Sequence, residues 1–297
     1  SPCLTSSRWS CSGRSSTGRR PSYGASPTTK VSARPGGTEL ALPEPMRILK
    51  KLLIDPGLDF IWPTRCVSCD ITASQRIFCR PCMETIVSGA EVCCPSCGLV
   101  WLDPPPGGGS HLCGDCLTSP PPWRRVRGAY AYGGPLRTAI QRWKNAPDDT
   151  LTRDLTRLMR DQVSPCGWDA IARGAIVVPI PASRRRLWRR GFNPAGVLAR
   201  ALATELQRPL ESRGLRARRP LTMTRRMSRK ERRQRVAQAF LGDPQRLRGR
   251  DILLVDDVMT TGATMRAAAR AAQLAGAQSV EGAVLARVPY GAASAGV

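Results

Sequence analysis

Acidic residues, histidine and long apolar runs are all scarce in this chain, and each shortage excludes a class of protein. The 22 Asp and Glu face 46 Lys and Arg, for a net charge of +24, so we expect polyanionic partners, either substrates with a pyrophosphate group or nucleic acid. No apolar run is long enough to span a membrane, which predicts a soluble, cytoplasmic protein without membrane insertion. Because the single histidine, His111, lies in a cysteine-rich region, no histidine stands out as a general base.

The first 45 residues differ in composition from the rest of the chain. Residues 1–45 are rich in Ser, Arg, Pro and Gly, show no hydrophobic periodicity and lack the apolar core of a secretory signal. They predict a disordered tail or an over-extended N-terminus. The amphipathic segment after Met46 predicts a short helix, and we take Met46 as the natural start. A hydrophobic content of 41% is typical of a globular chain.

Nine of the twelve cysteines fall between residues 66 and 116. Eight of them form four C-x2-C knuckles: Cys66/Cys69, Cys79/Cys82, Cys94/Cys97 and Cys113/Cys116. Two knuckles complete a tetrahedral site of four thiolates, so this spacing predicts two structural zinc ions rather than a disulfide framework. Pairing consecutive knuckles is the simplest assignment, and interleaved pairing stays open. Cys93 is left over, and His111 is interpreted as a bystander.

A second pattern lies at 252–264, where an unbroken apolar run, 252–255, predicts a buried parallel strand. The Ala- and Arg-rich 265–273 predicts a helix. The residues between them suit an anion at a helix N-terminus, preceded by two carboxylates for a vicinal diol or a divalent cation. Together they predict a ribose 5-phosphate site, unlike a Walker A loop, formed by Asp256, Asp257, Thr260, Thr261, Gly262, Ala263 and Thr264.

The stretch 179–193 follows another predicted strand and holds five arginines in a Pro- and Gly-containing segment. We predict a loop there in which Arg184 and Arg190 meet a diphosphate bidentately. The alternative is a basic face or nucleic-acid patch with Trp188 and Phe192 as stacking platforms. Both stay open, because residues 181–250 hold 20 Arg and one Lys against four acids, more charge than one pyrophosphate needs.

Strands alternating with helices predict an α/β fold with a doubly wound parallel sheet. The predicted strands are 128–133, 175–178, 252–255 and 280–288, and the predicted helices are 135–144, 148–163, 194–206 with Asn193 as its cap, and 265–273. Ligands of such sheets bind beyond the carboxyl ends of the strands. The predicted domains are a tail (1–45), a double zinc ribbon with a leading helix (46–117), a linker (118–127), the sheet domain (128–289) and a flexible tail (290–297).

Residues 252–264 resemble, at every position, the phosphoribosyl pyrophosphate (PRPP) motif of type I phosphoribosyltransferases. The cysteine knuckles, then Arg190-Gly-Phe-Asn193, then this motif follow one another along the chain. In this order of motifs the chain resembles the ComF (competence protein F) family. The resemblance implies PRPP binding with Mg2+, Asp256 and Asp257 as candidate catalytic residues, and a role in DNA uptake with a helicase-like partner on single-stranded DNA. Lys144 resembles a family lysine. Pro194, Thr224 and Arg235 depart from the family pattern and put the acceptor in doubt.

Three functions follow from these patterns. The first is a phosphoribosyltransferase that releases pyrophosphate from PRPP in nucleobase or nucleotide salvage. The second is a nucleic-acid-binding protein whose PRPP site serves as a sensor or a relic. The third is a structural adaptor whose ribbons dock a protein, and this function leaves the intact motif at 252–264 unexplained. Taken with the resemblance to the ComF family, the sequence favours a PRPP-binding protein, and the resemblance implies a link to natural transformation.

Overall fold

The protein is described from a computed structural model that covers residues 64–73, 77–89, 93–101, 111–163, 174–218 and 238–289. The chain divides into two compact units, Ser1–Leu52 and Leu53–Val297, and every described residue belongs to the second. The tails predicted at 1–45 and 290–297, the helix after Met46, Thr224 and Arg235 lie outside the described residues. The domain boundaries stay a prediction.

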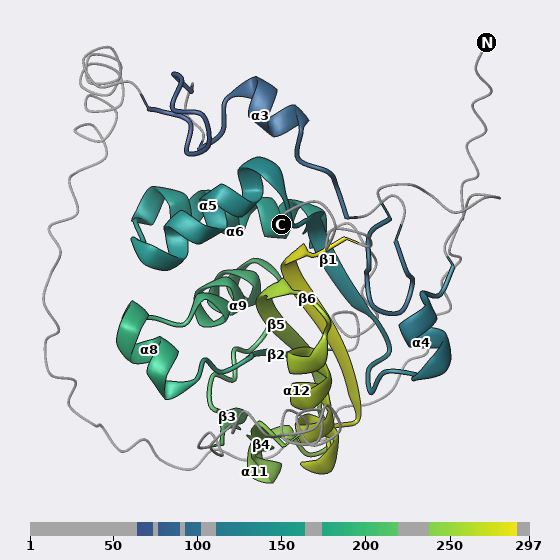
Figure 1. Ribbon diagram of the computed structural model, residues 1–297. Helices are drawn as coiled ribbons and strands as arrows, with labels where there is room; N and C mark the ends of the chain where they lie inside the picture. Colours follow the sequence, from purple (N-terminus) through teal and green to yellow (C-terminus); the bar gives the residue numbers. More distant parts are fainter. Residues whose placement is uncertain are drawn as a thin grey trace, which may run out of the picture. The chain divides into compact units, whose positions relative to one another are not determined.

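A four-stranded parallel sheet forms the centre of the second unit (Figure 1). Its strand order is β1-β6-β5-β2, with β1 at Val126–Ala131, β6 at Ser279–Arg287, β5 at Asp251–Met259 and β2 at Ile176–Pro179. All four predicted strands are present. Their bounds differ from the predicted ones, and two differences matter. β1 starts within the predicted linker, and β5 continues past 255 to Met259 because it stays paired with β6 to its end.

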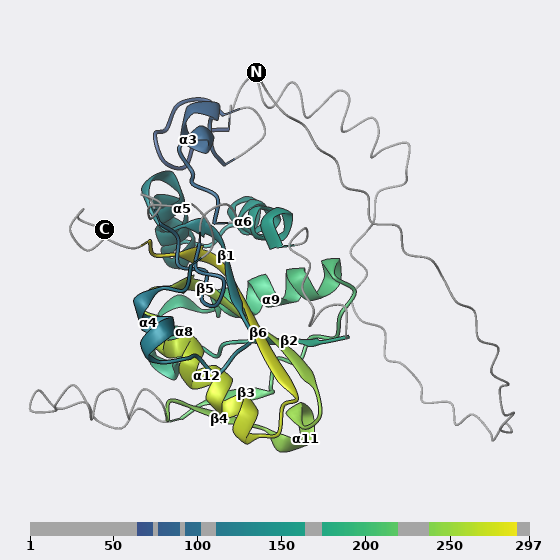
Figure 2. The same cartoon turned by 90° about the vertical axis from the view of Figure 1, so that its right-hand side faces the viewer.

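Helices cover both faces of this sheet, which confirms the predicted doubly wound arrangement (Figures 1 and 2). Side chains of β5 alternate: Leu253 and Val255 pack with one set of helices, whereas Ile252 and Leu254 pack with α12. The first set is α5 (Gly134–Asn145), α6 (Asp149–Val163) and α9 (Pro194–Glu205), and α12 spans Ala263–Leu274. Among the described helices, none has the length and apolarity to cross a membrane.

Several short elements were not predicted from the sequence. They are α3 (Arg80–Glu84), α4 (Gly114–Thr118), α11 (Pro244–Leu247) and the antiparallel pair β3 (Leu215–Ala217) and β4 (Phe240–Gly242). The loop predicted at 179–193 is also wrong in part, because Arg184–Arg190 forms helix α8. Ser183 begins α8 by accepting a hydrogen bond from the Arg186 amide, and Gly191, with φ 77°, ends it.

The cysteine-rich segment lies along the outer edge of β1. Ser88 pairs with Tyr130 in an antiparallel bridge, the Gly89 amide donates to the Ala129 carbonyl, and the Val126 amide donates to the Ser96 carbonyl. A Cβ on Gly89 would lie 2.2 Å from a backbone oxygen of β1, so only glycine permits this approach. The ribbons are therefore joined to the sheet by backbone hydrogen bonds.

Candidate functional site

The loop after β5 has the form that the sequence predicts for a phosphate site. β5 ends at Met259 and α12 begins at Ala263, so Thr260 and Thr261 lie where unpaired helical amides favour an anion. Both threonines are exposed. Gly262 has φ 76°, and a Cβ there would approach Met259 Cε to 2.6 Å. A glycine is thus required for this turn.

Two carboxylates immediately precede that loop, within β5. The Asp257 amide donates to Asp256 Oδ1 at 2.9 Å, and the Val258 amide donates to Asp257 Oδ1 at 2.9 Å. Burial raises the pKa of Asp256 well above its usual value, the charge of Asp257 raises it further, and Lys144 opposes the shift. A divalent cation bound beside these carboxylates would favour their charged forms and so oppose this shift in the pKa of Asp256.

Lys144, at the end of α5, holds the second carboxylate. Its Nζ lies 2.5 Å from Asp257 Oδ2, and the two side chains are only 18% and 14% exposed. The pair is non-local, so no pattern along the chain predicts it, although Lys144 was noted as resembling a family lysine. Lys144 therefore places a positive charge beside the Asp257 carboxylate.

We expect Lys144→Met to lower the unfolding free energy at pH 7 by about 1.5–3 kcal/mol, because the Asp257 carboxylate loses a charged hydrogen bond. Asp256 binds its proton more tightly when folded, so this group stabilises the fold at low pH, and that contribution declines as pH rises through its folded pKa. Removing Lys144 raises the pKa of Asp256 further. The deficit should therefore shrink on acidification in urea unfolding at several pH values.

Lys144→Arg keeps the charge and serves as the matched control for this experiment. It should unfold at nearly the same urea concentration as the wild type. A Lys144→Met deficit that stays constant from neutral to acidic pH would contradict the proposed balance between the lysine and the two carboxylates.

The segment after β2 reaches the same edge of the sheet as the carboxylates. The Ile180 amide donates to the Val255 carbonyl at 2.9 Å. Asn193, predicted as a helix cap, makes no capping hydrogen bond with its side chain, and its Nδ2 donates to the Ile180 carbonyl at 3.1 Å. Phe192 packs edge-on against Trp143 with ring centroids 5.5 Å apart. Phe192 thus packs partly against the core, and its interpretation as a stacking platform stays a prediction.

Helix α8 presents the predicted arginines next to that edge. Arg184 is exposed and Arg190 is half-buried. Within the described part of the chain, neither makes a hydrogen bond or ion pair with residues 256–264, so their contact with a diphosphate stays a prediction. Trp188, in the middle of α8, is 88% exposed.

The eight knuckle cysteines form two separate clusters. Within each cluster the sulfur atoms all lie within 4.8 Å of one another, and the members are Cys66, Cys69, Cys79 and Cys82 in the first and Cys94, Cys97, Cys113 and Cys116 in the second. This grouping matches consecutive pairing of knuckles rather than interleaving. One zinc with Zn–S bonds of about 2.3 Å fits four sulfurs so placed.

Backbone N–H groups donate hydrogen bonds to the cysteine sulfurs, as expected of zinc-binding thiolates. Burial opposes the charged form of Cys66, but hydrogen bonds from the Cys79 and Cys69 backbones lower its pKa to about 6. Cys94 occupies the equivalent position in the second cluster and accepts from the Cys113 amide at 3.3 Å, and its pKa is lowered in the same way against burial. Such N–H donors stabilise thiolate ligands. The two clusters support structural zinc.

Three residues that the sequence did not single out lie between the second cluster and the loop after β5. We call this loop, 260–264, the phosphate loop because the sequence predicts a phosphate site there. Arg287, the last residue of β6, donates to the carbonyls of Met259, at 3.0 Å, and Thr260. Trp123 Nε1 donates to the Ser96 carbonyl at 2.9 Å, and its ring lies 5.3 Å from the Arg266 guanidinium. A charged residue at the end of an apolar strand was the available signal for Arg287.

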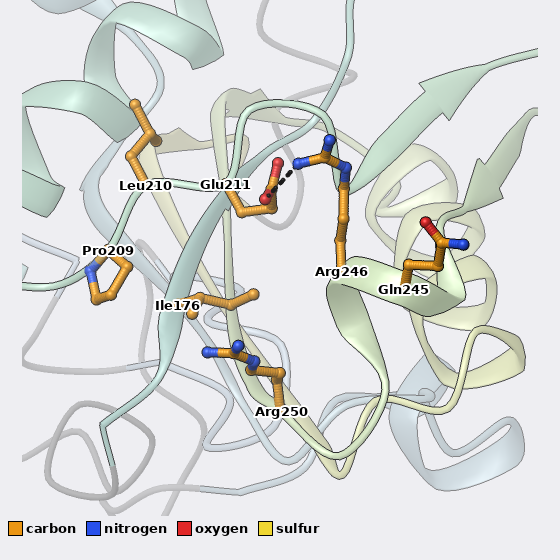
Figure 3. A pocket seen from close by; sticks show the side chains of 7 residues that line it. All are labelled: Ile176, Pro209, Leu210, Glu211, Gln245, Arg246 and Arg250. Carbon is orange, nitrogen blue, oxygen red and sulfur yellow. Dashed lines mark hydrogen bonds and ion pairs between the residues drawn. The ribbon is translucent and has the colours of Figure 1, made fainter. Parts of the chain in front are cut away.

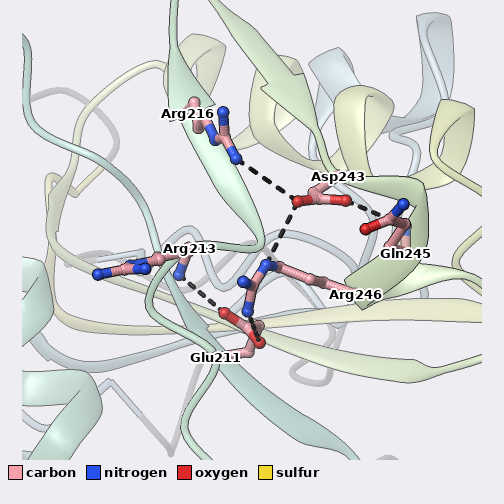
Figure 4. A network of polar contacts seen from close by, with 6 residues as sticks. All are labelled: Glu211, Arg213, Arg216, Asp243, Gln245 and Arg246. Carbon is pink, nitrogen blue, oxygen red and sulfur yellow. Dashed lines mark hydrogen bonds and ion pairs between the residues drawn. The ribbon is translucent and has the colours of Figure 1, made fainter.

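A cavity of about 440 Å³ lies beside the start of β2, at the end of the sheet opposite the loop after β5 (Figure 3). Arg246 lines it and binds Glu211 at 2.9 Å and Asp243 at 3.3 Å, and Arg216 lies 3.6 Å from Asp243 (Figure 4). These charges satisfy one another. The cavity contains none of the residues predicted for a ligand site, so the loop after β5 is the better candidate.

Fold and site together define a protein with a double zinc ribbon and a phosphoribosyltransferase-like domain. The phosphoribosyl transferase domain family matches residues 187–294, and the double zinc ribbon domain family matches residues 57–117. The chain belongs to the ComF family.

Three relatives illustrate this membership. "DNA utilization protein YhgH" of Escherichia coli O157:H7 is 32% identical over 193 residues, which cover 63% of this chain and 81% of the relative. "Competence protein F" of Haemophilus influenzae is 28% identical, with 73% and 94% covered. "Competence protein ComFC" of Bacillus subtilis is 26% identical, with 69% and 87% covered.

Proposed function

We propose that this protein binds PRPP at the loop after β5 and handles DNA, in uptake or utilization. The observation that carries the ligand is the combination of exposed Thr260 and Thr261 at the start of α12 with the carboxylates of Asp256 and Asp257. The names of its relatives, "DNA utilization protein" and "Competence protein", support the DNA role. A helicase-like partner, implied by the family resemblance, stays a prediction.

In the proposed complex, the 5-phosphate accepts hydrogen bonds from the backbone and hydroxyls of 260–264. The ribose diol donates to Asp256 and Asp257. Mg2+ would neutralise part of the diphosphate charge, and Arg184 and Arg190 of α8 would bind the rest. Because Lys144 already contacts Asp257, ligand binding exchanges one positive partner of that carboxylate for another.

The experiment that tests this proposal follows isotopic PRPP through binding and turnover. Equilibrium binding of PRPP with Mg2+ tests the site, and absence of binding by the intact, zinc-loaded protein would overturn it. Release of pyrophosphate with a panel of nucleobases, nucleosides and single-stranded oligonucleotides tests the second candidate function.

That second candidate is an active phosphoribosyltransferase of nucleobase or nucleotide salvage without a role in DNA handling. Its support is the same loop, where departure of pyrophosphate would leave a positively charged sugar stabilised by Asp256 and Asp257. Release of pyrophosphate with a free nucleobase, together with weak DNA affinity, would favour this alternative over the first.

The surface of α8 supports single-stranded DNA as the form of DNA that binds. Five arginines surround Trp188 on this helix, and a basic surface with an exposed aromatic ring suits phosphates and stacked bases. The five arginines exceed the need of one diphosphate, so α8 has charge available for a second polyanion.

We expect Trp188→Ala to weaken binding of a single-stranded oligonucleotide about 5- to 150-fold, because stacking on an aromatic residue contributes roughly 1–3 kcal/mol per base. The slope of log affinity against log salt should not change, since no phosphate contact is lost. Fluorescence anisotropy at several salt concentrations measures both. Leu187→Ala, on the same helix, is the matched control, and equal losses in the two variants would contradict stacking on Trp188.

A further inference from the structure

The second cysteine cluster and the phosphate loop line one cavity, of about 280 Å³, which is open to solvent at Thr260 and Thr261. Its lining includes Cys97, Cys113 and Cys116 from the cluster, Thr260 and Thr261 from the loop, and Trp123, Arg266 and Arg287 between them. The cluster and the loop are more than 140 residues apart in sequence, so only the tertiary fold brings them together.

Arg287 touches the loop directly. It lies opposite Met259 in the β5–β6 register and is 5% exposed. Its Nη1 donates to the carbonyls of Met259 and Thr260, whereas its buried Nε has no hydrogen-bond partner among the described residues. A guanidinium this deeply buried requires a nearby negative charge.

The second cluster lines the same cavity and would supply that charge when it holds zinc. Four thiolates outweigh one divalent zinc ion, so the metal-loaded cluster carries excess negative charge. Arg266 and Arg287 both line the cavity next to it and can balance this excess. Asp115 also lines the cavity, so the electrostatics favour neutralisation of the cluster over capture of a further anion.

Trp123 makes a second connection in parallel. Its indole N–H donates to the Ser96 carbonyl in the turn of the knuckle Cys94/Cys97. Its ring makes a cation–π contact with Arg266, which lies in the second turn of α12. The edge of the ring also lies 3.9 Å from the position that a Cβ on Gly262 would occupy. The knuckle, the start of α12 and the loop are therefore packed against one another.

We infer that Arg287 is a positioning residue that couples metal binding at the second cluster to the order of the phosphate loop. The negative cluster holds the guanidinium, and the guanidinium holds the carbonyls of Met259 and Thr260, so the amides of 260–264 stay directed at a phosphate. Loss of metal from this cluster releases Arg287 and loosens the loop. The first cluster packs instead near α6, where the Ile77 amide donates to Asp154, and should not affect the loop.

The inference rests on the proposed PRPP site only for its ligand, because the order of the loop can be measured without PRPP. Amide hydrogen exchange of the full-length, zinc-loaded protein should be about tenfold faster at 260–264 in Arg287→Gln, which loses a charged donor to two carbonyls. Both zinc ions, counted by a chromogenic chelator after thiol modification, should be retained. Exchange in the β5 core, 252–255, should match the wild type.

Arg270→Gln, an exposed change on α12, is the matched control and should exchange as the wild type does. Arg287→Lys keeps the charge but not the planar guanidinium and should restore part of the protection. Unchanged exchange at 260–264 in Arg287→Gln would overturn the inference.

Two cysteine variants test the metal side of the coupling. Cys97→Ser should lose the second zinc and accelerate exchange at 260–264, whereas Cys69→Ser should lose the first zinc and leave that segment unchanged. Equal exchange in the two variants would also overturn the inference. If Cys97→Ser does not fold, Arg287→Gln decides the question. If the wild type does not bind PRPP but the variants show the expected changes in exchange at 260–264, the proposed ligand is wrong and the coupling still holds.

Discussion

Replacing both carboxylates at the end of β5, in Asp256→Asn with Asp257→Asn, should reduce PRPP affinity at least about a hundredfold. Each carboxylate is expected to accept a hydrogen bond from a ribose hydroxyl or to contact the cation bound with PRPP, and a charged hydrogen bond contributes about 1.5–3 kcal/mol. Asparagine keeps the shape of the side chain and removes the charge. Isothermal titration with Mg2+ and PRPP measures the loss.

The fold should survive this change, which separates binding from stability. Burial raises the pKa of Asp256, so its charged form is disfavoured in the folded protein and a neutral amide suits the position. Lys144 loses its partner at Asp257, and adding Lys144→Met to the double variant should restore any lost thermal stability. Wild-type PRPP affinity in the double variant would rule out this assignment of the site.

Loss of one zinc ligand should have the second large effect. Cys94→Ser should reduce zinc from two ions to one per chain and lower the unfolding free energy by several kcal/mol, since structural zinc binds with about 10–16 kcal/mol in small zinc domains. Cys94 is fully buried, and its sulfur accepts a hydrogen bond from the Cys113 amide. A serine there replaces a thiolate with a poorer zinc ligand. Metal analysis and thermal unfolding measure the two effects.

The adjacent Cys93 offers a matched control of the same chemistry. It is also buried but lies outside both clusters, where its sulfur accepts a hydrogen bond from Arg127 at 3.5 Å. Cys93→Ser should keep both zinc ions and lose much less stability. Equal metal loss from Cys93→Ser and Cys94→Ser would show that the cluster has been assigned to the wrong cysteine.

The parts of the site that are local in sequence could be predicted. Residues 252–264 contain their own strand, turn and helix start, and the requirement for Gly262 follows from that turn. Each knuckle closes within four residues, so spacing alone indicates a metal site. Consecutive pairing was favoured as the simplest arrangement, and the structure has that arrangement.

The parts that depend on distant contacts could not be predicted. The end of β5 at Met259 is set by pairing with β6, and the Lys144–Asp257 pair joins a helix to a strand more than 100 residues away. Helix α8 was missed for a different reason. Its arginines and the flanking Gly191 suggested a loop, but Ser183 caps a turn of helix that ends at that glycine.

The backbone contacts between the cysteine-rich segment and β1 have a further consequence. An outer strand with unpaired amides and carbonyls is a template for strand addition by another molecule, and here residues 87–89 occupy part of that edge. Those residues are held between the two metal clusters. We therefore expect the metal-free chain to aggregate through β1, which light scattering after chelation would reveal.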